Sequence, residues 1–331
     1  MIIDIHGHLN APKDLYWAQA MLLASRGAHG PHGLVMTDEA LHAEGQWTVD
    51  ILDSVGTDLQ LISPRPFSLM HSEKPEKMVH WWAEANNDTI ARQVAMFPGR
   101  LQGVAALPQV SGRSPEVCLA ELERAITELG FVGCLLNPDP GEGDGQTPPL
   151  GDEHWYPLWE KLVELDVPAL VHSAACKNGR ETYSAHFISE ESLAILSLLD
   201  SRALVDFPTL KLIVSHGGGS VPYQIGRWRA GRYRGRYNQG GLADATFDES
   251  LRRLWFDTCL YSSLSLELLF RTVGADRCMF GTEKPGTGTV KDPETGRDMD
   301  DLKPVIEGLT CLTDADRASI FELNARAVFR L

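Results

Sequence analysis

Short apolar runs recur along the whole chain of 331 residues, and helical patterns lie between many of them. Strands are predicted at about 2–6, 59–63, 102–107, 131–136, 168–172, 211–215, 254–258 and 278–282. Strands that alternate with helices favour a parallel sheet, because each parallel crossover needs a connecting helix. Eight such units predict an α/β fold, a (β/α)8 TIM barrel.

The segments between the strands carry helix signals. Ser-Pro-Glu at 114–116 places a capping residue before a proline, and Gly130 can end the helix that follows. Apolar residues at helical spacing predict a helix over 155–165, and the acids of Ser-Glu-Glu at 189–191 favour another helix start. The last helix is predicted over about 314–329.

No linker or internal repeat divides the chain, so we expect one domain over 1–331. Two stretches without strong patterns, at about 10–37 and 284–300, would follow strands as long loops. In a barrel such loops lie at the C-terminal rim, where binding sites are built. The first is expected to include some helix over 14–25.

Charge and composition exclude several classes of function. The formal net charge of −15 argues against a general nucleic-acid or membrane-surface binder, since those need a basic face. No segment approaches 18 consecutive apolar residues, and the N-terminus lacks the pattern of a signal peptide. A cytoplasmic protein is the expectation. The six cysteines form no CxxC pair, which favours buried free thiols.

The first predicted strand ends in His6-Gly7-His8. Alternate residues of a strand share a face, so both imidazoles are expected on one side at the C-terminal end of the strand. Two imidazoles on one face are a ready pair of metal ligands, although two loop histidines are the simpler alternative.

Other predicted strands end in similar residue types. His172 ends the fifth, His216 ends the sixth before three glycines, and Glu283 follows the eighth. A barrel brings these ends together over one mouth, so together they predict a metal site there. Imidazole nitrogens with a carboxylate oxygen and no thiolate suit Zn²⁺, with Mn²⁺ or Fe²⁺ as competitors.

These motifs are where the chain resembles a known family. The His-x-His, His172, the His-Gly-Gly-Gly turn and the acid after Phe-Gly-Thr resemble the amidohydrolase superfamily, in its amidohydrolase-2 branch. Asn-Pro-Asp-Pro at 137–140 and the glutamate after strand eight resemble, within it, the 4-oxalomesaconate hydratase group. The resemblance runs to the Asn-Ala-Arg at 324–326. The loops at 173–187 and 284–290 depart from the group's pattern, which leaves the substrate open.

The resemblance implies one divalent metal, held by His6, His8, His172 and Glu283. Members with two metals bridge them with a lysine after strand four, where this chain has Asn137. Many relatives carry aspartate at position 283, and glutamate reaches about one methylene further, so it can touch the metal.

Further roles follow from position and chemistry. Glu283 or His216 is the expected acid–base group, and His216 is alternatively a fifth ligand, an outer contact of the ligands or a helix cap. Arg65 follows strand two and is the expected clamp for a carboxylate. Asn137 is a candidate substrate contact or a turn residue. Arg229 belongs to a group of arginines over 227–236, and we expect some of this group to balance an anionic substrate and others to face solvent.

The implied function is a metal-dependent lyase that adds water to the carbon–carbon double bond of an unsaturated keto polycarboxylate, in the catabolism of aromatic compounds. Its partners would be a small anionic substrate and other copies of itself, with no nucleic acid or membrane. Alternatives are a metal-dependent, non-oxidative decarboxylase, a lactone hydrolase, or a barrel that has lost catalysis and its metal.

Overall fold

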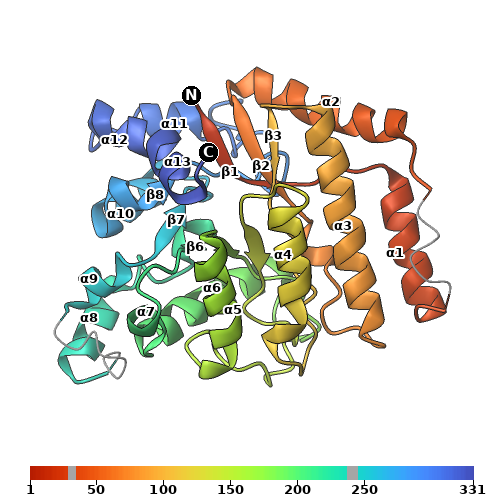
Figure 1. Ribbon diagram of the computed structural model, residues 1–331. Helices are drawn as coiled ribbons and strands as arrows, with labels where there is room; N and C mark the ends of the chain where they lie inside the picture. The colour runs from red at the N-terminus through yellow and green to blue at the C-terminus, as the bar shows by residue number, and fades with distance from the viewer. Residues whose placement is uncertain (29–34, 237–244) are drawn as a thin grey trace.

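The computed structural model describes residues 1–28, 35–236 and 245–331. Short parallel strands lie at the centre and helices surround them (Figure 1). All eight predicted strands are confirmed in position, most of them shorter than predicted. They are β1 (Ile3–His8), β2 (Leu59–Ser63), β3 (Leu101–Gly103), β4 (Cys134–Leu136), β5 (Ala169–Val171), β6 (Leu212–Val214), β7 (Trp255–Asp257) and β8 (Cys278–Met279).

The strands pair in chain order as β1–β2–β3 and β4–β5–β6–β7–β8, and every pair is parallel. Backbone contacts join the two sheets at both seams. Ala105, two residues after β3, forms a parallel bridge with Cys134, the first residue of β4. On the other side, the Ile5 amide donates to the Phe280 carbonyl at 2.9 Å. These bonds close the strands into the predicted (β/α)8 barrel.

The helices among the described residues pack around the barrel, and the chain termini lie close together, where Arg326 contacts both Met1 and Leu331 (Figure 1). The larger ones are α1 (Lys13–Ser25), α2 (Asp38–Val55), α3 (Lys77–Met96), α4 (Leu119–Thr127), α5 (Tyr156–Leu165), α6 (Tyr183–Leu199), α8 (Ile225–Tyr233) and α10 (Ser263–Val273). The shorter ones are α7 (Ala203–Asp206), α9 (Phe247–Leu251), α11 (Lys303–Glu307), α12 (Asp314–Ala318) and α13 (Asn324–Phe329).

Most helix predictions are confirmed, with local corrections. The helix after Ser114 opens as a 3-10 turn, and the last helix contains a π-helical segment at Ser319–Leu323. The predicted start at 189–191 is wrong, because α6 begins at Tyr183 after an extended Thr182. Glu191 is there for another reason: its buried carboxylate contacts His216 from inside the helix.

The core divides into two clusters. One holds inner strand residues of the barrel, and the other lies between the strands and the surrounding helices. The inner cluster includes Ile5, Leu61, Leu135, Leu170, Ile213 and Met279. In β1 the pairing register shifts between Asp4 and Gly7, and this stretch contains both Ile5 of the inner cluster and His6.

The two predicted rim loops differ in structure. The 10–37 stretch contains α1, which agrees with the helix predicted over 14–25. Residues 29–34 of this stretch lie outside the described residues, and so does Tyr237, which follows the arginines over 227–236. The 284–300 stretch follows β8 and contains no helix. It is held by the buried Lys284, whose ammonium lies 2.7 Å from Asp300 and 2.8 Å from Asp298.

Candidate metal centre

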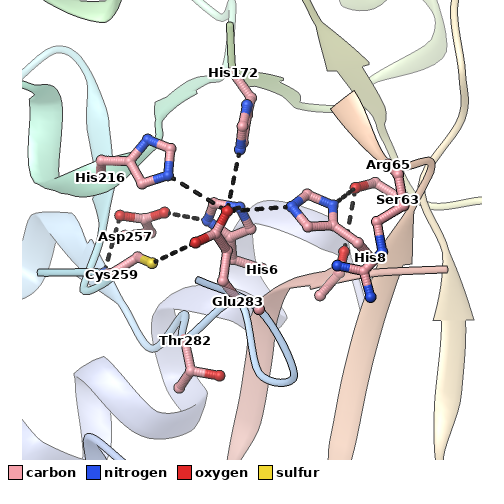
Figure 2. Close-up of polar contacts among 12 residues, drawn as sticks. His6, His8, Ser63, Arg65, His172, His216, Asp257, Cys259, Thr282 and Glu283 are labelled. Atoms are coloured by element: carbon pink, nitrogen blue, oxygen red, sulfur yellow. Dashed lines mark hydrogen bonds and ion pairs between the residues drawn. The ribbon is translucent and has the colours of Figure 1, made fainter. Parts of the chain in front are cut away.

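Three histidines and one glutamate converge at the C-terminal ends of the strands. His6 and His8 come from β1, His172 follows β5, and Glu283 follows β8 (Figure 2). One potential ligand atom from each of these four residues lies within 4.8 Å of the others. All four residues are buried. The structure therefore brings together the four residues that the sequence predicts as ligands.

Each of the three imidazoles is held through its Nδ1 atom. The Nδ1 of His6 lies 2.5 Å from Asp257 Oδ2, and that of His8 lies 2.8 Å from Ser63 Oγ. The Nδ1 of His172 lies 2.6 Å from the carbonyl of Ser173. Such contacts fix the orientation of an imidazole and leave the other nitrogen free to bind a metal.

The Nε2 atoms of His6, His8 and His172 are buried without a hydrogen-bond partner. They face Glu283 Oε1 at 3.9, 3.5 and 3.8 Å, respectively. A buried nitrogen without a partner is costly, so these atoms need a group that satisfies them. A divalent cation does this for all three at once, and the residues present therefore fit a metal.

The ionisation of three of these four groups suits cation binding. His6 differs, because burial lowers its pKa but contacts with Asp257 and Glu283 outweigh this and raise it. Burial lowers the pKa of His8 well below its usual value and that of His172 to about 4, which keeps both rings neutral. Burial raises the pKa of Glu283, but contacts with His172, His216 and His8 outweigh this and hold it well below its usual value. Neutral imidazoles and a carboxylate are the forms that bind metals.

His216 lies beside the four, after β6, and its backbone has a φ of +50°. Its Nδ1 lies 2.9 Å from both carboxylate oxygens of Glu191, and its Nε2 lies 3.6 Å from Glu283 Oε1. Burial lowers its pKa, but these two carboxylates raise it well above its usual value. His216 does not cap the following turn, and it is placed to exchange a proton with Glu283 or with a ligand bound there.

Glu283 is also held through its second carboxylate oxygen. The Tyr261 hydroxyl donates to its Oε2 at 2.7 Å, while Cys259 Sγ lies 3.7 Å from the same oxygen. Both Tyr261 and Glu283 have positive φ, at +52° and +61°. Strained backbone of this kind concentrates at functional sites. Oε1 is thereby left to face the imidazoles.

Two cavities open beside Glu283. One, of about 430 Å³, is lined by His8, Arg65, Tyr183, Glu283 and the start of the 284–300 loop. The other, of about 220 Å³, is lined by residues that include His216, Cys259, Tyr261 and again Tyr183 and Glu283. The glutamate therefore lies between two spaces that a small substrate can enter.

Of the three predicted substrate contacts, the structure brings only Arg65 to these cavities. Its guanidinium is oriented by the side chain of Asn10 and by the carbonyls of Leu9 and Pro285. Asn137 is fully buried, and its side chain bonds His71 and the Asp139 backbone, as a turn residue does. Arg229 lies on α8, paired with Asp248.

Sequence reasoning assigned no role in the site to Ser63, Glu191, Asp257 or Tyr261. A signal for Asp257 existed, since an acid at the end of strand seven sits on the same rim as the ligands. Glu191 and Tyr261 carried no such signal, because their positions within a helix and a loop do not say which neighbour they face.

Comparison with known proteins agrees with this geometry. The amidohydrolase family profile matches residues 3–331. A 2-keto-4-carboxy-3-hexenedioate hydratase of Sphingobium sp. (strain NBRC 103272 / SYK-6) is 37% identical over 99% of this chain and 96% of its own length. Gamma-resorcylate decarboxylase of Rhizobium sp. (strain MTP-10005) is 29% identical over 75% of the chain and 76% of its own length.

Solved structures give the same grouping. The 4-oxalomesaconate hydratase of Rhodopseudomonas palustris has a TM-score of 0.87 and 34% identity, covering 100% of this chain and 96% of that one. A dihydroxybenzoic acid decarboxylase of Polaromonas sp. JS666, solved with bound manganese, has a TM-score of 0.76 at 23% identity, covering 100% and 97%. No helix among the described residues meets the length and hydropathy needed to cross a bilayer. The chain belongs to the amidohydrolase family.

Proposed function

We propose that the protein is a metal-dependent hydro-lyase that adds water across the carbon–carbon double bond of an unsaturated keto polycarboxylate. The observation that carries this proposal is the four-residue metal centre, in which the carboxylate of Glu283 is oriented by Tyr261. Similarity to two hydratases over nearly the full chain supports the substrate class.

His6, His8, His172 and Glu283 would hold one divalent ion, and we propose Zn²⁺ because three imidazoles and a carboxylate suit it. Mn²⁺ remains the alternative, since it accepts the same donors and is bound in a decarboxylase of the same fold. Such an ion supplies Lewis acidity and lowers the pKa of water at the site.

The chain's own residues would handle the protons and the substrate's charge. Glu283 would accept a proton from the attacking water, because its Oε1 faces the histidines while the Tyr261 hydroxyl is bound to Oε2. His216, held by Glu191, is the second proton-transfer group. Arg65 faces the larger cavity and would bind a substrate carboxylate and the charge that develops on the conjugated oxygen.

The direct test is to supply the metal-loaded protein with the keto and enol forms of 4-oxalomesaconate. Loss of their ultraviolet absorbance is expected as the conjugated double bond is hydrated. If a fully metallated and folded protein leaves the absorbance of both forms unchanged, this substrate assignment is wrong.

The second candidate is a non-oxidative decarboxylase, favoured by the similarity to gamma-resorcylate decarboxylase. It would release CO₂ from an aromatic carboxylate, which headspace analysis measures. The expectations of a homo-oligomer and of a cytoplasmic location stay predictions, and the first is tested by light scattering after gel filtration.

A further inference from the structure

Cys259 lies inside the candidate site without a part in the proposed hydration. It comes two residues after β7, its side chain is buried, and its Sγ lies 3.7 Å from Glu283 Oε2 (Figure 2). The thiol also contacts the Tyr261 hydroxyl at 3.2 Å. A thiol in this place adds a soft ligand atom next to a carboxylate and an imidazole.

The imidazole is that of His216. Its Nδ1 is occupied by Glu191, which leaves Nε2 directed toward Glu283 (Figure 2). One ligand atom each from His216, Cys259 and Glu283 lies within 4.8 Å of the others. Zinc bonds of about 2.0–2.3 Å place ligand atoms about 3.3–3.8 Å apart around a tetrahedral ion. Cys259 Sγ lies 3.7 Å from Glu283 Oε2, which matches that spacing, while His216 Nε2 lies 3.6 Å from the other oxygen, Oε1.

We propose that His216, Cys259 and Glu283 form a second position for a divalent metal ion, next to the first. Glu283 is shared: Oε1 faces the imidazoles of the first position and that of His216, and Oε2 faces Cys259. The donor set of nitrogen, sulfur and oxygen takes thiophilic ions such as Zn²⁺ and Cd²⁺. Mn²⁺ and Mg²⁺, which prefer oxygen ligands, are not expected to fill it.

Binding at this second position is expected to be weaker than at the first. The incoming ion must displace the proton of the Cys259 thiol, and it competes with the Tyr261 hydroxyl for Glu283 Oε2. At the first position three nitrogens are already without partners. The second position therefore fills only when metal exceeds one equivalent.

Occupation of this position would inhibit the enzyme. It would engage Glu283 and His216, which the proposed function assigns to proton transfer, so this inhibitory consequence rests on the proposed function. The binding of the second ion does not depend on the proposed function. Loss of general acid–base catalysis typically costs on the order of a hundredfold or more in rate.

The test uses protein stripped of metal and reloaded with one equivalent of Zn²⁺, then titrated with Cd²⁺. Zinc and cadmium are counted by elemental analysis after gel filtration, and thiolate-to-cadmium absorption is followed in the near ultraviolet. We expect a second equivalent of metal, a rise in this absorption, and roughly a hundredfold loss of turnover. Titration with Mn²⁺ in place of Cd²⁺ should produce none of these changes.

Matched variants locate the ion. Cys259→Ser should abolish the absorption and the second equivalent. Cys176→Ser should retain both, although Cys176 lies near Glu181 and His186 in another group of potential ligands. His216→Gln keeps the thiol and should bind the second equivalent much more weakly, which provides an independent check if Cys259→Ser does not fold.

The proposal is overturned if saturating Cd²⁺ never adds a second equivalent, or if the thiolate absorption persists in Cys259→Ser and disappears in Cys176→Ser. Metal counts and absorption need no substrate. A protein that binds the second ion but does not hydrate 4-oxalomesaconate would contradict the proposed function alone.

Discussion

The barrel mouth and helix α8 are both rich in residue types that carry function, but their environments are opposite. At the mouth, the Nε2 atoms of His6, His8 and His172 are buried and have no partner. On α8, the exposed guanidinium of Arg229 makes hydrogen bonds of 2.6 to 3.1 Å to Asp248. The nitrogens at the mouth have no hydrogen-bond partner within the protein, whereas the guanidinium on α8 already has one.

This difference shows how candidate sites can be ranked. Residue type and position along the chain made both the barrel mouth and α8 candidate sites. These two criteria could not show which of the regions binds a ligand. Burial without a partner does, because an unsatisfied buried polar atom costs free energy unless something binds it. Substitutions at the mouth should therefore change metal binding and turnover strongly, and substitutions on α8 weakly.

The largest effect is expected for Glu283→Gln. The amide can no longer accept a proton from water, and its neutral oxygen is a poorer ligand, so turnover of 4-oxalomesaconate should fall by about 10³-fold or more. Steady-state assays at saturating metal, with metal content measured, would check this. A variant that holds its metal and keeps a tenth of the wild-type turnover would remove Glu283 from the proposed chemistry.

Asp257→Asn should weaken metal binding about 10- to 100-fold, because the carboxylate orients the ring of His6 and strengthens its nitrogen as a ligand. Competition with a chelator measures the affinity. Ser63→Ala is the matched control at His8, where a neutral hydroxyl makes the equivalent contact, and it should cost less. An equal loss of metal affinity in both variants would contradict the claim that the carboxylate of Asp257 strengthens His6 as a ligand.

These two residues also show the reach and the limit of sequence reasoning. Glu283 could be predicted, because it follows a strand whose end had to lie at the mouth. The contacts of Asp257 could not, since which nitrogen of His6 it holds depends on a pairing across 251 residues. The barrel itself was predictable because eight apolar runs repeat the same local pattern.

Asn137 and Arg229, predicted as substrate contacts, lie away from the two cavities beside Glu283 for a physical reason. Asn137 ends a strand on the correct rim, but the turn that follows uses both ends of its side-chain amide. Arg229 is one of several arginines whose spacing on a helix does not reveal which acids lie nearby. Whether a polar side chain already has a hydrogen-bond partner depends on the tertiary structure, so a local sequence pattern does not reveal it.

Arg65→Lys should raise the KM for 4-oxalomesaconate about tenfold and lower kcat less, because lysine cannot bind a carboxylate bidentately. Loss of the contacts with Asn10 and Pro285 would also loosen the orientation of the side chain. Initial rates over a range of substrate concentrations separate the two parameters. An unchanged KM would show that the substrate carboxylates bind elsewhere.

The smallest effect is expected for Arg229→Ala. Its ion pair with Asp248 is exposed, and such pairs contribute up to about 1 kcal/mol to the free energy of unfolding. Turnover should stay within about twofold of wild type, and urea denaturation should show only this small change. A large increase in KM would indicate that Arg229 binds the substrate, and it would contradict the difference drawn between α8 and the barrel mouth.

The most direct test of the account is the mass of the product formed from 4-oxalomesaconate by the metal-loaded protein. A hydro-lyase at this mouth should yield a product heavier than the substrate by one water, with no CO₂ released. A product lighter by one CO₂ would contradict the assignment and identify the chain as a decarboxylase on the same barrel.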